Sequence, residues 1–173
     1  MNKENAIKIP VCRMKTIITI CLMLFGAIVL SQRDAWAQAQ DLTLFRDTNG
    51  KYGFIDNTGK TIIKPEYDKA FKFSEGLAGI RQNGKWGFID TSGKEIVKPH
   101  YNYVGSFHNG IAYINIGGNV DGYGNAHGGK WGLIDKTGKE IVSPKYDEVY
   151  RYFIEDYTIV KLGEKYGVID KTG

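Results

Sequence analysis

The most regular ionisable side chains in this sequence are carboxylates that recur in one local pattern. Asp56, Asp90, Asp135 and Asp170 each follow an isoleucine and stand three residues before a glycine. A row of such carboxylates could bind cations. Asp also favours the start of a turn, where its side chain accepts hydrogen bonds from the nearby backbone. Because every copy stands at the start of a turn pattern, we expect these carboxylates to be structural.

No other set of potentially reactive side chains recurs or clusters. The histidines His100, His108 and His127 are scattered, whereas metal sites need clustered ligands. No Ser, Thr or Cys is placed with a plausible base, and the sequence has no phosphate-binding G-x-x-x-x-G-K-[ST] pattern. We therefore expect no metal, no cofactor and no catalytic residues. A pair of carboxylates for glycoside hydrolysis stays open from the sequence alone.

One segment breaks the regular pattern and is the best candidate for a binding site. Residues 117–129 are rich in glycine and interrupt a hairpin that elsewhere needs only two residues. Insertions in repeat proteins form loops on one face, often the binding face. The candidate ligand-binding residues here are Asp121, Tyr123, Asn125 and His127. Plain length variation in a surface loop is the competing interpretation. The glycines predict a mobile loop that contributes little to stability, so replacing residues 117–129 by Asn-Gly should leave the fold intact, with an unchanged or slightly raised melting temperature, and should weaken partner binding.

A repeated unit positions all of these residues. Its most regular stretch opens at Lys51, Lys85, Lys130 and Lys165, which we expect to be solubilising residues at strand ends. Self-similarity at a nearly fixed spacing is typical of repeat architectures. The repeats divide the chain into units at about 42–76, 77–110 and 111–156, with a partial unit at 157–173.

Each unit is predicted to be a three-stranded antiparallel meander. In the second unit, residues 77–82 and 85–90 are strand candidates, and Asn83-Gly84 between them favours a two-residue hairpin. Residues 94–98 form the third strand, which Pro99 should end because proline has no N–H for a ladder. The segment 66–76 is expected to form a helical turn that covers the sheet.

The recurring aromatic residue and the glycine after it also need an explanation. We assign Tyr52, Trp86, Trp131 and Tyr166 to packing between repeats, the alternative being an aromatic row that stacks on sugars or bases. Alternation places Trp86 and Phe88 on one face of the strand, with Ile89 on the other. Glycine weakens a strand, so its recurrence predicts a close approach of neighbouring backbone or of a ring.

The first 37 residues have the features of a secretory signal peptide. A basic stretch precedes an apolar run at residues 16–30, and Ala35-Trp36-Ala37 forms an A-x-A site. A membrane anchor is the alternative, but the run is short of the ~20 residues that span a bilayer. This segment also holds both cysteines and most of the excess positive charge. The remaining chain has no basic stripe of the kind that nucleic-acid binders carry.

The core pattern K-[WY]-G-[FLV]-I-D-x-x-G-K-x-[IV]-[IV]-x-P-x-Y, followed by F-S-E-G-L-A in the first unit, resembles the bacterial WG-repeat proteins. The resemblance covers about residues 41–173. It implies an all-β fold of tandem repeats, often on exported proteins and without assigned catalytic residues. We expect an open solenoid-like or superhelical array, with propeller-like closure as the alternative.

The expected function is that of an exported, non-catalytic binding or scaffold module, located in the periplasm, on the cell surface or outside the cell. Its expected partner is a protein or a cell-envelope component, not a nucleic acid, and no transmembrane span is expected in residues 38–173. The alternative is a hydrolase acting on envelope carbohydrate, which an assay panel on envelope glycans would distinguish.

Cleavage after Ala37 is the first testable expectation. Mass spectrometry of the exported protein should show an N-terminus at Gln38, because small residues occupy both positions that the peptidase reads. Recovery of the uncleaved chain in the membrane fraction would instead support the anchor.

Overall fold

The computed structural model describes residues 42–121, 126–150 and 156–173. The leading segment 1–37 therefore lies outside the described residues. Within them all regular structure is β-strand, and the strands form small antiparallel sheets with no closed barrel. This confirms the expected all-β array of tandem repeats. No helix in the described part of the chain is long and apolar enough to cross a membrane.

Four sheets and one inserted ribbon make up the fold. The first sheet contains β1 (Thr43–Arg46), β2 (Tyr52–Ile55) and β3 (Thr61–Tyr67). The second contains β4 (Lys69–Ala70), β5 (Leu77–Gln82), β6 (Lys85–Asp90) and β7 (Glu95–Tyr101). The third contains β8 (Tyr103–Val104), β9 (Ile111–Ile116), β12 (Lys130–Asp135) and β13 (Glu140–Tyr146). The fourth contains β14 (Glu148–Val149), β15 (Tyr157–Leu162) and β16 (Lys165–Asp170). The ribbon pairs β10 (Asn119–Val120) with β11 (Ala126–His127).

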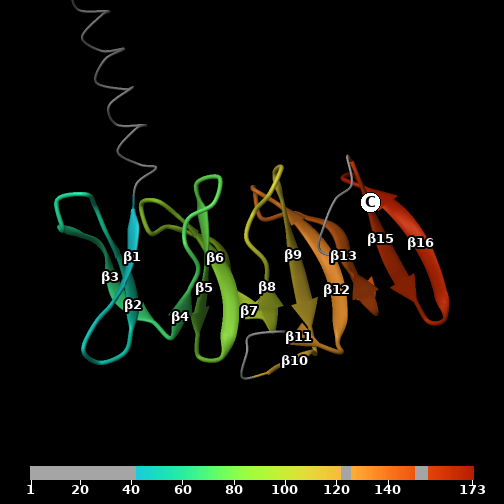
Figure 1. Ribbon diagram of the computed structural model, residues 1–173, viewed down its shortest axis with the longest axis horizontal. Coiled ribbons are helices and arrows are strands. Elements are labelled where there is room, and N and C mark those ends of the chain that lie inside the picture. Colours follow the sequence, from blue (N-terminus) through green and yellow to red (C-terminus); the bar gives the residue numbers. More distant parts are fainter. Residues whose placement is uncertain (1–41, 122–125, 151–155) are drawn as a thin grey trace, which may run out of the picture. The chain divides into compact units, whose positions relative to one another are not determined.

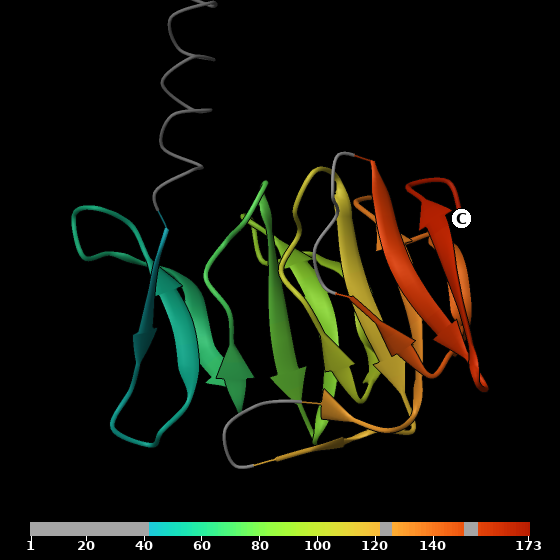
Figure 2. The ribbon, with the colours of Figure 1, turned by 45° about the vertical axis from the view of Figure 1, so that its right-hand side comes forward.

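The sheets follow one another in chain order, as the two ribbon views show (Figures 1 and 2). Consecutive sheets contact each other through β3 and β5, β7 and β9, and β13 and β15. The core is accordingly divided into three clusters of buried side chains, one at each junction between sheets. Each repeat thus completes its core only by packing on its neighbours.

The central strand of the second sheet shows how the alternation works. Trp86 and Phe88 are buried in the cluster shared with the third sheet, and Ile89 is buried in the cluster shared with the first. Trp86 is 3% exposed and Trp131 5%, which confirms their assignment to packing between repeats. Tyr166 is 60% exposed, so the same assignment is wrong for it. No described strand covers its face of the fourth sheet.

The recurring glycine lies under the backbone of the third strand. Trp86 pairs with Tyr101 and Phe88 with Val97, so a β-bulge of the third strand lies opposite Gly87. A Cβ on Gly87 would meet the carbonyl oxygen of Val97 and lie 2.8 Å from the nitrogen of Pro99. The predicted close approach is therefore confirmed. The predicted strand end at Pro99 is wrong, because the bulge removes the ladder hydrogen bond that proline cannot make.

The segment after the bulge also differs from expectation. Residues 66–76 contain no helical turn; instead β4 pairs with β5, through Lys69 with Arg81 and Ala70 with Ile80. The Phe71 N–H also donates to the carbonyl oxygen of Gly79 at 2.8 Å. These ladder hydrogen bonds pair backbone N–H and C=O groups that would otherwise bond within a helical turn. The second and third sheets are therefore four-stranded, and each sheet after the first begins at a short strand upstream of the predicted unit boundary.

The turns match the residues that form them. Asn83 and Gly84 both have positive φ, 51° and 79°, which is the two-residue hairpin predicted from the sequence. The recurring aspartates close the other hairpin of each unit. Asp135 Oδ1 accepts hydrogen bonds from the Thr137 N–H at 2.8 Å, the Thr137 hydroxyl at 2.6 Å and the Lys139 N–H at 3.1 Å. The equivalent bonds at Asp56 and Asp90 confirm the structural role of these carboxylates.

The same hydrogen bonds make the fold sensitive to acid. The Thr137 hydroxyl bond lowers the pKa of Asp135 below its ordinary value of 3.8, and the Thr58 hydroxyl bond does the same for the pKa of Asp56. At low pH the unfolded chain binds protons more readily than the folded chain, so folding stability is lost as the pH falls below ~5. We expect the melting temperature to fall steadily from about pH 5 to pH 2.

Asp135→Asn keeps a turn-forming acceptor but cannot titrate, so this variant should show a shallower dependence of melting temperature on pH. Equal slopes for the parent and Asp135→Asn would contradict the role given to the turn carboxylates.

Candidate functional site

The recurring lysines form contacts that the sequence did not suggest. The Nζ of Lys51 lies 2.6 Å from Asp68 Oδ1, and that of Lys130 lies 2.6 Å from Asp147 Oδ1. Lys85 makes the equivalent bond to Asn102 Oδ1 at 3.0 Å. These three lysines therefore lie at strand ends, as expected, and in addition each binds a residue between two sheets.

Each partner of these lysines also binds the next hairpin. Asp147 Oδ2 accepts the N–H of Gly163 in the β15–β16 turn at 2.7 Å. Asn102 Oδ1 accepts the N–H of Gly117, after β9, at 2.9 Å. The lysine bond is the main cause of the lowered pKa of Asp147. These recurring charges therefore connect one sheet to the next.

The histidines do not assemble a metal site. His100 Nδ1 lies 2.7 Å from the carbonyl oxygen of Lys98, beside the bulge. His127 Nε2 lies 2.8 Å from Asp121 Oδ2, and the His127 ring is exposed. Among the described residues no three side chains of His, Cys, Asp or Glu are grouped as metal ligands.

The described parts of the insertion are joined to the array. Asn115 is fully buried, and its side chain binds both ends of the insertion. Its Nδ2 donates to the carbonyl oxygen of Gly128 at 3.0 Å, and its Oδ1 accepts the N–H of Gly118 at 3.0 Å. Asn102 Nδ2 adds a bond to the Gly118 carbonyl oxygen at 3.0 Å.

The apolar side chains of the ribbon pack as well. Ala126 is buried in the cluster that contains Trp131, and Val120 packs against that cluster. The expectation of an insertion that contributes little to stability is therefore wrong for its described residues. Of the proposed ligand-binding residues, Asp121 and His127 are brought together, while Tyr123 and Asn125 lie outside the described residues.

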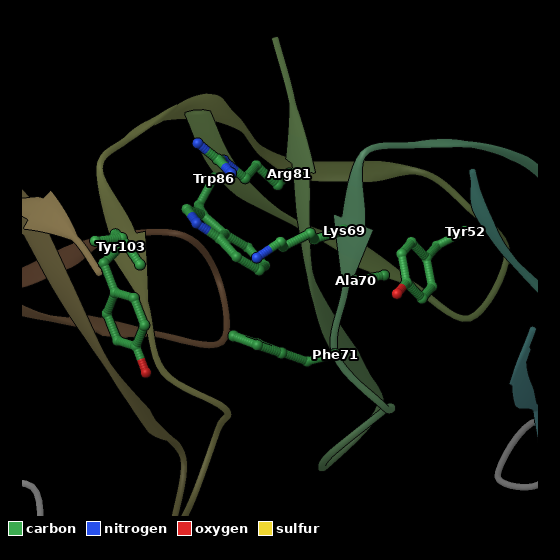
Figure 3. Close-up of a pocket in the computed structure, with 8 residues that line it drawn as sticks. Tyr52, Lys69, Ala70, Phe71, Arg81, Trp86 and Tyr103 are labelled. Atoms are coloured by element: carbon green, nitrogen blue, oxygen red, sulfur yellow. The ribbon is translucent and has the colours of Figure 1, made fainter. Parts of the chain in front are cut away.

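A pocket lies beside this ribbon, at the edge of the second sheet formed by β4. Its volume is about 210 Å³. Side chains from the first three sheets and from the ribbon line it: Tyr52, Lys69, Ala70, Phe71, Arg81, Trp86, Tyr103 and Val120. Figure 3 shows most of these side chains around the shared space. The predicted insertion thus contributes to a site through Val120, which was not among its proposed binding residues.

Aromatic rings give the pocket its walls. Phe71 stacks on Trp86 with ring centroids 4.5 Å apart and an interplanar angle of 22°. Tyr103 meets Trp86 edge to face at 6.5 Å, and it meets Trp131 in the same manner at 5.8 Å. Such offset and edge-to-face pairs each add about 0.5–1.5 kcal/mol to the burial energy. The walls are therefore fixed by the core of the array.

Two cations complete the pocket. Lys69 and Arg81 are direct cross-strand partners, and Arg81 is also the partner of Trp86 (Figure 3). Like charges placed directly opposite destabilise a sheet. The Nε of Arg81 is buried and has no hydrogen-bond partner among the described residues. Leaving a buried donor without a partner costs about 1–3 kcal/mol.

The fourth sheet shows how the repeat neutralises this position elsewhere. There Glu148 is the cross-strand partner of Lys161, and their side chains form an ion pair at 3.0 Å. Glu148 aligns with Lys69, and Lys161 aligns with Arg81. The second sheet therefore carries a lysine where the fourth carries the neutralising glutamate. Among the described residues, none of the side chains that line the pocket is a carboxylate.

Sequence reasoning missed the pocket, although part of its signal was present. The residues opposite the recurring aromatic share one register position, which is cationic or amide-bearing in every unit: Arg46, Arg81, Asn115 and Lys161. Aligning the chain on this position, in place of the K-[WY]-G stretch, would have drawn attention to Arg81. Its partner Lys69 becomes visible only once β4 is known to be a strand.

Comparisons with known proteins agree with the repeat pattern. A comparison with curated proteins and one with solved structures each gave no match. The family model described as WG containing repeat matches three tandem stretches, at residues 52–86, 86–119 and 131–166. Each stretch includes one of the glycines that lie under a bulge, namely Gly53, Gly87 and Gly132. The chain belongs to the WG-repeat family.

Proposed function

We propose that this chain is an exported, non-catalytic repeat protein that binds a component of the cell envelope through the pocket beside β4. The observation that carries the proposal is the pocket itself. It is the place where aromatic walls, two cations and the insertion in the hairpin of the third unit meet. Ligand sites are typically concave, mostly apolar and equipped with a few polar groups.

The contacts that the recurring polar side chains make support a binding function over a catalytic one. The aspartates Asp56, Asp90 and Asp135 accept turn hydrogen bonds, and the lysines pair with the residue that joins two sheets. These groups are engaged in holding the fold. The groups that line the pocket are suited to contact and charge attraction, because Lys and Arg side chains donate hydrogen bonds and accept none.

Export rests on the leading segment. A basic stretch, a short apolar run and an A-x-A site occur in the order of a secretory signal peptide. A protein that is exported and carries no repeated reactive group fits a role in the periplasm, at the cell surface or in the medium. Its expected partner there is an envelope component or another exported protein.

The direct test is a pull-down of envelope fractions with the exported chain. We expect one class of component to be retained by the parent and released when Arg81 is replaced by Ala. Hydrolysis of envelope glycans by the purified chain would overturn the non-catalytic assignment. Retention that is indifferent to the pocket variant would move the site to another surface.

Replacing residues 117–129 by Asn-Gly provides a second test, and the structure changes its expected result. The variant should still fold, because β9 and β12 pair along their full length. Its melting temperature should fall, because Asn115 loses the bonds to Gly118 and Gly128 that satisfy a buried amide. Partner binding should weaken, because Val120 leaves the pocket.

The matched control is His127→Ala, which removes only the exposed pair with Asp121. Exposed ion pairs contribute about 0–1 kcal/mol, so this variant should melt like the parent. A replacement variant with an unchanged or raised melting temperature would show that the ribbon is independent of the array.

A further inference from the structure

We propose that the pocket beside β4 binds a single carboxylated sugar ring, a hexuronate, with its carboxylate at the Lys69–Arg81 pair and its ring against Phe71, Trp86 and Tyr103. This inference rests on the proposed binding function and names the ligand class of the same site.

The charge of the ligand follows from the cross-strand pair. Lys69 and Arg81 face each other across the β4–β5 ladder, and no carboxylate of the described residues lines the pocket around them. No hydrogen bond or ion pair of the Lys69 ammonium is found in the described part of the chain. Arg81 Nε is buried and without a partner there. A carboxylate has two acceptor oxygens, so it can accept hydrogen bonds from both cations at once.

The comparison with the fourth sheet supports this assignment. The same cross-strand position holds Glu148 and Lys161, whose side chains satisfy each other at 3.0 Å. The repeat can therefore supply its own carboxylate at this position. In the second sheet a lysine occupies the place of that carboxylate, and both members of the pair line the pocket. We infer that the ligand supplies the missing carboxylate.

The size and walls of the pocket define the remainder of the ligand. Pockets for drug-sized molecules measure roughly 300–1,000 Å³, so a volume of about 210 Å³ fits one ring and not several. Phe71, Trp86 and Val120 offer apolar surface, and Tyr52 and Tyr103 add phenol groups to the lining. A pyranose ring combines an apolar C–H face with hydroxyl groups at its edge, so it matches both kinds of surface.

Lys69 also has a second possible role, because lysines on edge strands discourage pairing between molecules. That role requires a charge of either sign at the edge of the sheet. The proposed role requires a positive charge. Reversing the charge therefore separates the two.

The experiment is calorimetric titration of the full chain with D-glucuronate, D-glucose, benzoate and acetate. Glucuronate should bind saturably at one site. Glucose should bind at least ~10-fold more weakly, since it lacks the carboxylate and hydrogen bonds to charged groups are each worth about that factor or more. Benzoate and acetate keep the carboxylate but lack the hydroxyl groups of the sugar ring, so they should also bind more weakly than glucuronate. Equal binding of benzoate would overturn the sugar assignment. Equal binding of acetate would reduce the site to a simple anion site, and absence of saturable glucuronate binding would overturn the inference.

Lys69→Glu is the decisive variant. It recreates the Glu148–Lys161 arrangement against Arg81, so we expect a melting temperature equal to or above the parent's and a loss of glucuronate affinity of at least ~10-fold. Lys72→Glu changes the net charge equally at an exposed residue outside the pocket and should bind like the parent. Unchanged affinity in Lys69→Glu would overturn the inference.

Two further results separate the role of the aromatic rings, and the class of ligand, from the proposed binding function. Glu148→Lys builds a like-charge pair in the fourth sheet without the enclosing Phe71, Trp86 and Tyr103, and it should add no second glucuronate site. If Glu148→Lys did gain a second glucuronate site, the rings would not be needed for binding, and the proposal would be contradicted. If the parent retains an envelope component in the pull-down but does not bind glucuronate, the ligand class is wrong while the proposed binding function stands.

Discussion

The close contact between the recurring glycine and the proline bulge is the constraint on which the other features depend. At Gly53, Gly87 and Gly132 the third strand folds its backbone across the space that a side chain would occupy. The bulge lets the strand continue past its proline, which brings Tyr101 opposite Trp86. From there the chain turns directly into the short first strand of the next sheet. Without this contact, consecutive sheets would not share a core, and β4 would not stand where it forms one side of the pocket.

The local elements could be predicted because each depends on residues adjacent in the sequence. Asn83-Gly84 has the backbone freedom of a tight hairpin, and Asp90 accepts hydrogen bonds from residues two and four positions later. The short strand β4 could not be predicted in this way. Its two residues carry no periodic signal, and its pairing depends on where Arg81 lies in a strand that is distant in sequence. The prediction that the strand ends at Pro99 failed for a related reason. The sequence does not show that a bulge lies opposite Gly87, and this bulge removes the ladder hydrogen bond that the proline cannot donate.

The candidate site illustrates a second limit of sequence reasoning. The insertion drew attention because it breaks the repeat, and its glycines suggested mobility. Gly118 and Gly128 are instead held by the buried amide of Asn115, which replaces the cation found at this register position in the other units. The residues that stand out in the structure, Lys69 and Arg81, follow the repeat spacing, and only Lys69 differs in charge from its counterpart in the fourth sheet, Glu148. A change of sign at one position of a repeat becomes informative once its partner across the ladder is known.

The most direct test of the central contact compares Gly132→Ala with Gly167→Ala by denaturant unfolding of the full chain. A Cβ at Gly132 would meet the Val142 carbonyl oxygen and lie 2.9 Å from the nitrogen of Pro144, whereas at Gly167 the nearest atom is a Val160 methyl carbon 3.9 Å away. Gly132→Ala should therefore lower the free energy of unfolding by about 2 kcal/mol or more. Gly167→Ala should change it by no more than about 1 kcal/mol, since alanine suits a strand better than glycine. Equal losses in the two variants would contradict the account, because the glycine would then be required by the strand itself and not by the bulge that crosses it.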